Sequence, residues 1–285
     1  FGSVGLATRT SIEFAAIYVG PILMIAFCTP VLMRVIRLAK AQNITSIADF
    51  IAARYGKSQA VAATAACIAI IGSVPYIALQ LKAVASSLET ILNQDQEFSS
   101  IPYVGDIALL VTITLAMFAV LFGTRHADAT EHQDGLALAV AVETVVKLAA
   151  FLAIGLMVTF LIYGGPGDMF DRLAQNTQVQ QAMGYSTSLA TWLVLTGLSG
   201  FAIIMLPRQF YVTIVENRGE AELRTATWVF PLYLLAINLF VLPIAFAGLS
   251  LVGSRTSSDL YVLSLPLFNR PDVLAMAAFT RGRAA

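Results

Sequence analysis

Apolar residues along this chain gather into long continuous runs that are separated by short polar connections. Six runs are long and apolar enough to cross a hydrocarbon core of about 30 Å as helices. They span residues 12–33, 59–88, 106–123, 136–163, 188–206 and 226–250, and a further run begins at 273–279. Because lipid offers backbone groups no hydrogen-bond partner, each run is predicted to be helical. The pattern therefore predicts an all-α membrane protein with residues 1–285 forming one transmembrane domain.

Composition supports this prediction and narrows the functions. Apolar residues make up 58% of the chain and charged residues 12%, whereas about 25% of the residues in a soluble domain are charged. Membrane lipid is therefore the expected surroundings. The formal net charge is zero, so there is no electrostatic argument for binding nucleic acid. The sequence contains no nucleophile elbow, P-loop or zinc-protease motif, so we do not expect an enzyme.

Basic residues predict how the chain is oriented. The connection 34–58 is rich in Arg and Lys, while the connection 89–106 has neither. By the positive-inside rule the loop 34–58 is cytoplasmic and residue 1 lies outside. Alternation then puts nine basic residues inside (Arg34, Arg37, Lys40, Arg54, Lys57, Arg125, Arg208, Arg218 and Arg224) and four outside (Arg9, Arg172, Arg255 and Arg270).

The two ends of the sequence suggest a fragment. The chain opens on Phe1 rather than Met, outside the membrane, so we expect a span upstream. Its last residues interrupt an apolar run that has only begun, which suggests a truncated or frameshifted C-terminus. In the loop 34–58, Thr45 or Ser46 is suited to cap a short surface helix that Gly56 closes.

Two clusters of small residues are candidates for broken helices. Thr196-Gly197-Leu198-Ser199-Gly200-Phe201 lies in the middle of a span, and Gly2-Ser3-Val4-Gly5 precedes it by about 195 residues with four spans between them. In transporters built from inverted repeats, glycine-interrupted segments at corresponding places mark the solute and ion site. The predicted solute-binding residues here are Gly2, Ser3, Gly5, Gly197, Ser199 and Gly200. The alternative for the second cluster is a helix-packing face of small residues.

Charged and polar side chains within spans supply further candidates. Glu143 and Lys147 lie one helical turn apart inside their span, where charges are rare and are functional candidates by default. They predict an ion pathway; a structural ion pair near the interface is the alternative. Pro75 is able to free a backbone carbonyl, and Tyr76 and Gln80 are placed to line a solute pocket or to form an interhelical hydrogen bond.

A loop between two spans carries four possible metal ligands, but their spacing matches no standard site. A solvated loop is therefore the favoured interpretation, and the metal ligands of this chain stay unknown. The residues concerned are His126, Asp128, Glu131 and His132.

Several stretches resemble the sodium/solute symporter family, above all the symporter-like N-terminal membrane module of some bacterial sensor histidine kinases. The resemblance covers nearly the whole chain. Its most specific segments are residues 44–58, 74–84, 205–210 and 215–217. The first resembles symporters in general, and the others are similar to the kinase-linked branch.

The resemblance implies a LeuT-type fold of inverted five-helix repeats, here incomplete, in a bacterial inner membrane. It implies solute between the broken first and sixth core helices, with residues 2–5 ending the first. It also implies sodium as the coupling ion, held mainly by the first and eighth core helices and so mostly outside this sequence. Glu143 falls where symporters often carry an acid, but a glutamine usually follows one turn later, where this chain has Lys147.

Two functions follow from these expectations. The first is sodium-coupled uptake of a small organic solute by alternating access. The second is a membrane sensory input domain that binds or moves a solute and signals to a partner or to a C-terminal kinase domain. Amino acids and organic acids are both plausible solutes, because helix N-termini at a break favour carboxylates.

Overall fold

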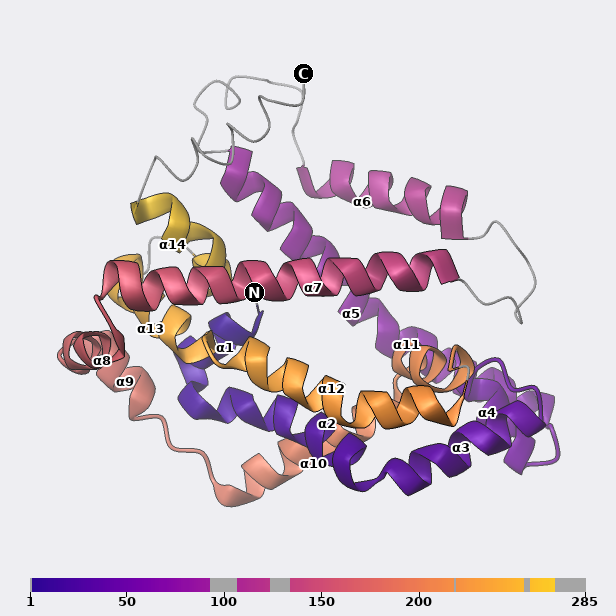
Figure 1. The fold of residues 1–285 in the computed structure, drawn as a ribbon. Coiled ribbons are helices and arrows are strands. Elements are labelled where there is room, and N and C mark those ends of the chain that lie inside the picture. Colours follow the sequence, from indigo (N-terminus) through magenta and orange to yellow (C-terminus); the bar gives the residue numbers. More distant parts are fainter. Residues whose placement is uncertain (1, 93–106, 124–133, 218, 254–256, 270–285) are drawn as a thin grey trace. The chain divides into compact units, whose positions relative to one another are not determined.

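The computed structural model describes residues 2–92, 107–123, 134–217, 219–253 and 257–269, and these residues form helices and short connections without any β-strand (Figure 1). Four helices are long and apolar enough to cross a membrane: Gly2–Phe27, Gln59–Glu89, Leu138–Ile162 and Glu220–Leu251. Leu189–Met205 and Pro207–Val215 make a fifth if they are one interrupted span. The prediction of an all-α membrane protein is confirmed at this level. The four possible metal ligands of the loop (His126, Asp128, Glu131 and His132) and the apolar run 273–279 lie outside the described residues.

The described chain divides into two compact units. The first unit takes in residues within Phe1–Arg34, Gln133–Ile204 and Asn217–Ala285, and the second takes in residues within Val35–His132 and Met205–Glu216. Helices of the first unit are α1 (Gly2–Thr10), α2 (Ala16–Phe27), α7 (Asp134–Leu156), α8 (Pro166–Ala174), α9 (Thr177–Met183), α10 (Leu189–Met205, whose last residue belongs to the second unit), α12 (Glu220–Asn238), α13 (Val241–Leu251) and α14 (Tyr261–Asn269).

The second unit is smaller. Its helices are α4 (Ile47–Arg54), α5 (Gln59–Leu92), α6 (Ile107–Phe118) and α11 (Pro207–Phe210), and it receives the end of α3 (Thr29–Ala41). Short 3-10 turns occupy Ser11–Ala15 and Ser258–Leu260, and π-helical turns occupy Ala119–Gly123, Met157–Ile162 and Tyr211–Val215.

Small and branched apolar side chains form the core of the first unit. Helix α1 packs against α13, and Val4 and Ala7 of α1 share a fully buried cluster with Ile244 and Ala247 of α13. Small side chains on both helices allow their backbones to approach closely, which is how membrane helices gain packing contacts without a hydrophobic driving force. This packing fixes the position of α1, where one of the predicted glycine clusters lies.

The short helix predicted in the loop 34–58 is confirmed as α4. Ser46 is its N-cap and accepts a hydrogen bond from the Asp49 backbone N–H at 3.1 Å. The helix is followed by Gly56, whose φ of 65° is a conformation that glycine adopts without steric cost. Phe50 of α4 packs against Phe210 with ring centroids 5.5 Å apart, which joins α4 to α11 within the second unit.

Hydroxyl side chains on the membrane helices bond mainly to their own backbones. Seven of these hydroxyls donate to the carbonyl four residues earlier, at 2.7–2.9 Å. They belong to Thr64, Ser73, Ser87, Thr112, Thr144, Thr159 and Thr227. This back-bonding is the usual way in which Ser and Thr are accommodated inside helices.

The glycine cluster of α10 lies in a continuous helix, so the break predicted at Gly197–Gly200 is wrong. Helix α10 runs unbroken from Leu189 to Met205. Gly200 is buried against Gly20 of α2, and a Cβ built on Gly200 would stand 3.1 Å from the Gly20 carbonyl oxygen. Ser199 Oγ donates to the carbonyls of Thr196 and Ala16 at 3.0 and 3.1 Å. The alternative of a small-residue packing face is therefore confirmed for Gly200 and Ser199.

Two of the observed interruptions fall near prolines. Leu206 separates α10 from α11 with extended backbone angles (φ −71°, ψ 133°) and precedes Pro207. A residue before proline is pushed out of the helical region, which explains the position of this break. Likewise α2 ends at Phe27 and α3 begins at Thr29, with Pro30 in its first turn, so the predicted run 12–33 is divided. The cluster Gly2–Gly5 is helical, and the irregular turn comes after it at Ser11–Ala15.

The close contact of α2 with α10 makes a prediction about stability. A Cβ on Gly20 would lie 2.6 Å from the Gly200 amide nitrogen, so Gly20→Ala should destabilise the folded state by about 1–3 kcal/mol through overpacking. Gly197→Ala is the matched control on the other helix, since a Cβ there meets no atom within 4 Å; it should be neutral or stabilising by up to about 1 kcal/mol. Unfolding midpoints in detergent, followed by circular dichroism, measure both. Equal midpoints for the two variants would contradict the contact.

Candidate functional site

A series of polar side chains crosses the first unit from α1 to α7. Ser3 of α1 is hydrogen-bonded to the phenol of Tyr18 on α2. Tyr233 lies on α12, which packs against both α2 and α7, and Lys147 of α7 is ion-paired with Glu143. We call these five residues the polar chain. The two predicted sites, one on α1 and one on α7, thus lie in the same unit, and α2 and α12 between them carry tyrosines that sequence reasoning did not single out.

Packing between helices brings the polar chain together. Helix α12 contacts both α2 and α7, so a side chain on α12 is placed to bridge the other two. Tyr18 and Tyr233 are half-buried. A phenol joins a large apolar ring to one hydroxyl that donates and accepts, which suits a position between apolar helices and a polar partner.

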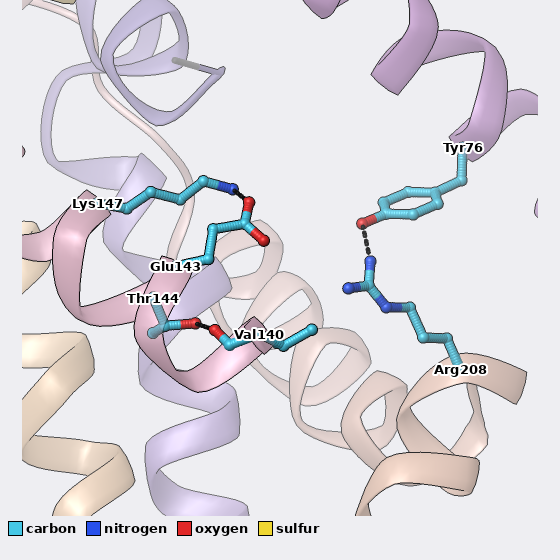
Figure 2. Close-up of polar contacts among 6 residues, drawn as sticks. All are labelled: Tyr76, Val140, Glu143, Thr144, Lys147 and Arg208. Carbon is cyan, nitrogen blue, oxygen red and sulfur yellow. Dashed lines mark hydrogen bonds and ion pairs between the residues drawn. The ribbon is translucent and has the colours of Figure 1, made fainter. Parts of the chain in front are cut away.

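The ion pair of Glu143 and Lys147 lies well inside α7 (Figure 2). Glu143 is nine residues after the helix start at Asp134, or about 14 Å along the axis. The side chains are 57% and 68% exposed for Glu143 and Lys147 respectively. Next to them Thr144 donates to the Val140 carbonyl at 2.7 Å and so presents no free donor. The exposed polar groups here are therefore the two charges, and both can be reached from outside the unit.

The remaining residues predicted on α1 and α10 have different surroundings. Gly2 is exposed, and a Cβ on it would meet nothing within 4 Å. A Cβ on Gly5 would lie 3.2 Å from the Asp259 Cα, so this glycine permits close packing. Gly197 is exposed.

Thr196, one residue before Gly197, was not singled out from the sequence. Its hydroxyl oxygen is buried and makes no hydrogen bond to any described residue. Three further buried polar atoms of the described residues, in Tyr163, Asn217 and Asn238, share this property, so it does not by itself mark a binding site. This hydroxyl lies on α10 one turn from Gly200, within the predicted solute-binding cluster.

The second unit contains its own polar contact. Arg208 Nη1 donates to the Tyr76 phenol at 3.5 Å, a long hydrogen bond (Figure 2). Tyr76 lies near the middle of the 34-residue helix α5, and Gln80 is exposed one turn further along. Arg208, expected in a cytoplasmic connection, therefore reaches the middle of α5. The segments 74–84 and 205–210, both singled out in the sequence, meet in this contact.

Of the polar residues that sequence reasoning missed, Arg208 has a recognisable signal in the sequence and the two tyrosines have none. Arg208 follows Leu206-Pro207, and this dipeptide marks the helix break that carries its side chain towards α5. Tyr18 and Tyr233 give no such signal, because a tyrosine in an apolar run is equally suited to a core position. Only the packing of α12 on α2 and α7 distinguishes them.

Comparisons with protein-family profiles, with curated proteins and with solved structures found no match. Within the described ranges, no three His, Cys, Asp or Glu side chains are grouped so as to hold a metal ion.

The surroundings of the ion pair can be tested by a double-mutant cycle. If the pair lines a water-filled pathway, solvent screens the attraction, and the coupling between Glu143→Gln and Lys147→Gln should be below about 1 kcal/mol. If both side chains face hydrocarbon, each single variant leaves an unpaired charge and should cost about 3–5 kcal/mol. Unfolding free energies of the two single variants and the double variant in lipid nanodiscs decide between these outcomes. We expect the smaller coupling.

Proposed function

We propose that this chain is the membrane module of a secondary transporter that takes up a small organic solute together with sodium by alternating access. The observation that carries the proposal is the polar chain. It comprises the exposed charge pair within α7, the hydrogen bond of Ser3 on α1 to Tyr18 on α2, and Tyr233 on α12, the helix that packs against both α2 and α7. Ionisable groups at such depth mark ion and substrate pathways in membrane proteins.

Glu143 is the member best suited to meet a cation. Its carboxylate offers hard oxygen ligands of the kind that alkali and alkaline-earth ions prefer. Lys147 competes for the same oxygens, so a sodium ion that passes must displace the ammonium or share the carboxylate with it. Glu143 is therefore proposed as a relay on the ion pathway and not as the main sodium site.

The charge at Arg208 favours a solute that carries a carboxylate. A guanidinium binds carboxylates through two parallel hydrogen bonds, and the Arg208 side chain is exposed beside Tyr76 and near the middle of α5. Amino acids and organic acids share this group. Both belong in the first screen of solutes.

Uptake into proteoliposomes that contain the full-length protein tests the proposal. A panel of amino acids and organic acids is offered with and without a sodium gradient. Glu143→Gln should lower sodium-dependent uptake at least about tenfold, equivalent to about 1.4 kcal/mol, because the relay carboxylate is lost. Tyr233→Phe, which removes one hydroxyl worth about 1 kcal/mol, should lower uptake about fivefold.

Asp171→Asn is the control for removing a carboxylate. Asp171 is exposed on α8 and lies outside the polar chain, so its variant should transport at the normal rate. Normal sodium-dependent uptake by Glu143→Gln would refute the proposed pathway. Solute binding without uptake by the unmodified protein, measured as a thermal shift, would favour the sensory function in its place.

A further inference from the structure

An open apolar groove runs along the first half of α5 in the second unit. It has a volume of about 720 Å³. One wall is Ile47 and Ile51 of α4 together with Tyr55, the residue that follows the helix. The floor is α5 from Ala60 to Ser73, and the remaining wall is the helix break at Met205–Pro207. The thirteen residue-to-residue steps from Ala60 to Ser73 measure about 20 Å along an α-helix. The groove is thus slightly longer than the hydrocarbon of one leaflet, which is about 15 Å, or half of the bilayer core.

The lining of this groove is unsuited to a polar solute. No charged residue contributes to it. The hydroxyls of Thr64 and Ser73 face their own helix, where they donate to the carbonyls of Ala60 and Ala69 at 2.9 and 2.7 Å. Ile68, which lines the floor, is 67% exposed. An occupant would therefore meet mainly methyl and methylene groups along the length of the groove.

One end of the groove is positively charged. Arg54, at the end of α4, and Lys57, in the turn before α5, are both exposed, and they flank Tyr55, the lining residue nearest that end, without lining the groove themselves. The first amide groups of α5 point towards the same end and add the positive pole of a 34-residue helix. The nearest acid on α4 is Asp49, in its first turn, and its carboxylate accepts from the Thr45 amide at 3.4 Å. The positive charge at the α4–α5 turn is therefore not neutralised from within α4.

From this arrangement we infer that the groove is a binding site for one anionic phospholipid of the leaflet that contains the α4–α5 turn. The phosphate lies between Arg54, Lys57 and the first turn of α5, and one acyl chain follows α5 towards Ser73. An apolar groove of leaflet length that ends in uncancelled positive charge matches a lipid with a negative headgroup. Because the turn lies in the basic loop 34–58, the leaflet concerned is the cytoplasmic one if the positive-inside prediction holds.

Native mass spectrometry of the full-length protein measures this site. The protein is released from nanodiscs of equimolar phosphatidylglycerol and phosphatidylcholine, and the lipids that remain bound are counted. The unmodified protein should retain phosphatidylglycerol over phosphatidylcholine. The double variant R54Q/K57Q should lose that preference, while Arg172→Gln, a basic residue on α8 of the first unit, should keep it.

Filling the groove tests the position of the acyl chain. A Cβ on Gly72 meets no atom within 4 Å, so Gly72→Leu extends into the groove without a clash. It should lower retained phosphatidylglycerol about tenfold, because the added side chain displaces roughly two methylene groups of the acyl chain from the groove. Gly72→Ala controls for the gain in helix propensity. Ala63→Leu, which adds bulk at an exposed position of α5 outside the groove lining, controls for apolar surface.

Three outcomes would overturn the inference. The first is equal retention of the two lipids by the unmodified protein, a measurement that needs no variant. The second is retention by Gly72→Leu that equals retention by Ala63→Leu. The third is a dimer of the unmodified protein that Gly72→Leu dissociates, which would identify a second copy as the occupant. None of these outcomes depends on solute uptake, so the lipid site and the proposed function fail independently.

Discussion

Hydrocarbon offers no hydrogen-bond partner to a peptide group, and this constraint shapes each helix described above. It explains why apolar runs become helices, and why the interruptions at Cys28 and Leu206 are short and lie next to prolines. A break in a membrane helix frees carbonyls that must find other donors. The proline at each interruption ends one helix and begins the next within a residue or two, so few backbone groups are left without a partner.

The same constraint decides where polar side chains can lie. In the first unit the charges of Glu143 and Lys147 are paired with one another, and the hydroxyls of Ser3 and Tyr18 are bonded across two helices. In the second unit the charge of Arg208 reaches a phenol. Each arrangement lowers the cost of a polar group among apolar neighbours, yet the charged side chains stay exposed. Enclosing a charge pair costs several kcal/mol per ion in desolvation, and exposure avoids this cost where water reaches the pair.

The sequence predicted the helical class, a cap of α4 at Thr45 or Ser46, of which Ser46 is the one observed, and the spacing of Glu143 and Lys147, because these depend on periodicity or on local hydrogen bonds. It misplaced the helix breaks. Glycine was given more weight than proline, although glycine at Gly200 serves close packing and proline removes a donor. The surroundings of Tyr18 and Tyr233 were beyond prediction, since they depend on α12 lying against both α2 and α7. The surroundings of Thr196 were also beyond prediction, because residues distant in sequence decide whether its hydroxyl has a hydrogen-bond partner.

Hydroxyl groups that bond to their own helix allow the polarity of a helix surface to change while the backbone stays in place. Thr64, Ser73 and Thr144 each donate to a carbonyl that a backbone amide is also placed to bond in a regular helix. When such a hydroxyl rotates away, the carbonyl keeps its amide partner, so little is lost on the helix side. A helix face can therefore change from apolar to hydrogen-bonding by rotation about χ1 alone, a motion of picoseconds to nanoseconds at exposed positions. Water entering beside α5 or α7 would meet polar groups without any displacement of the backbone.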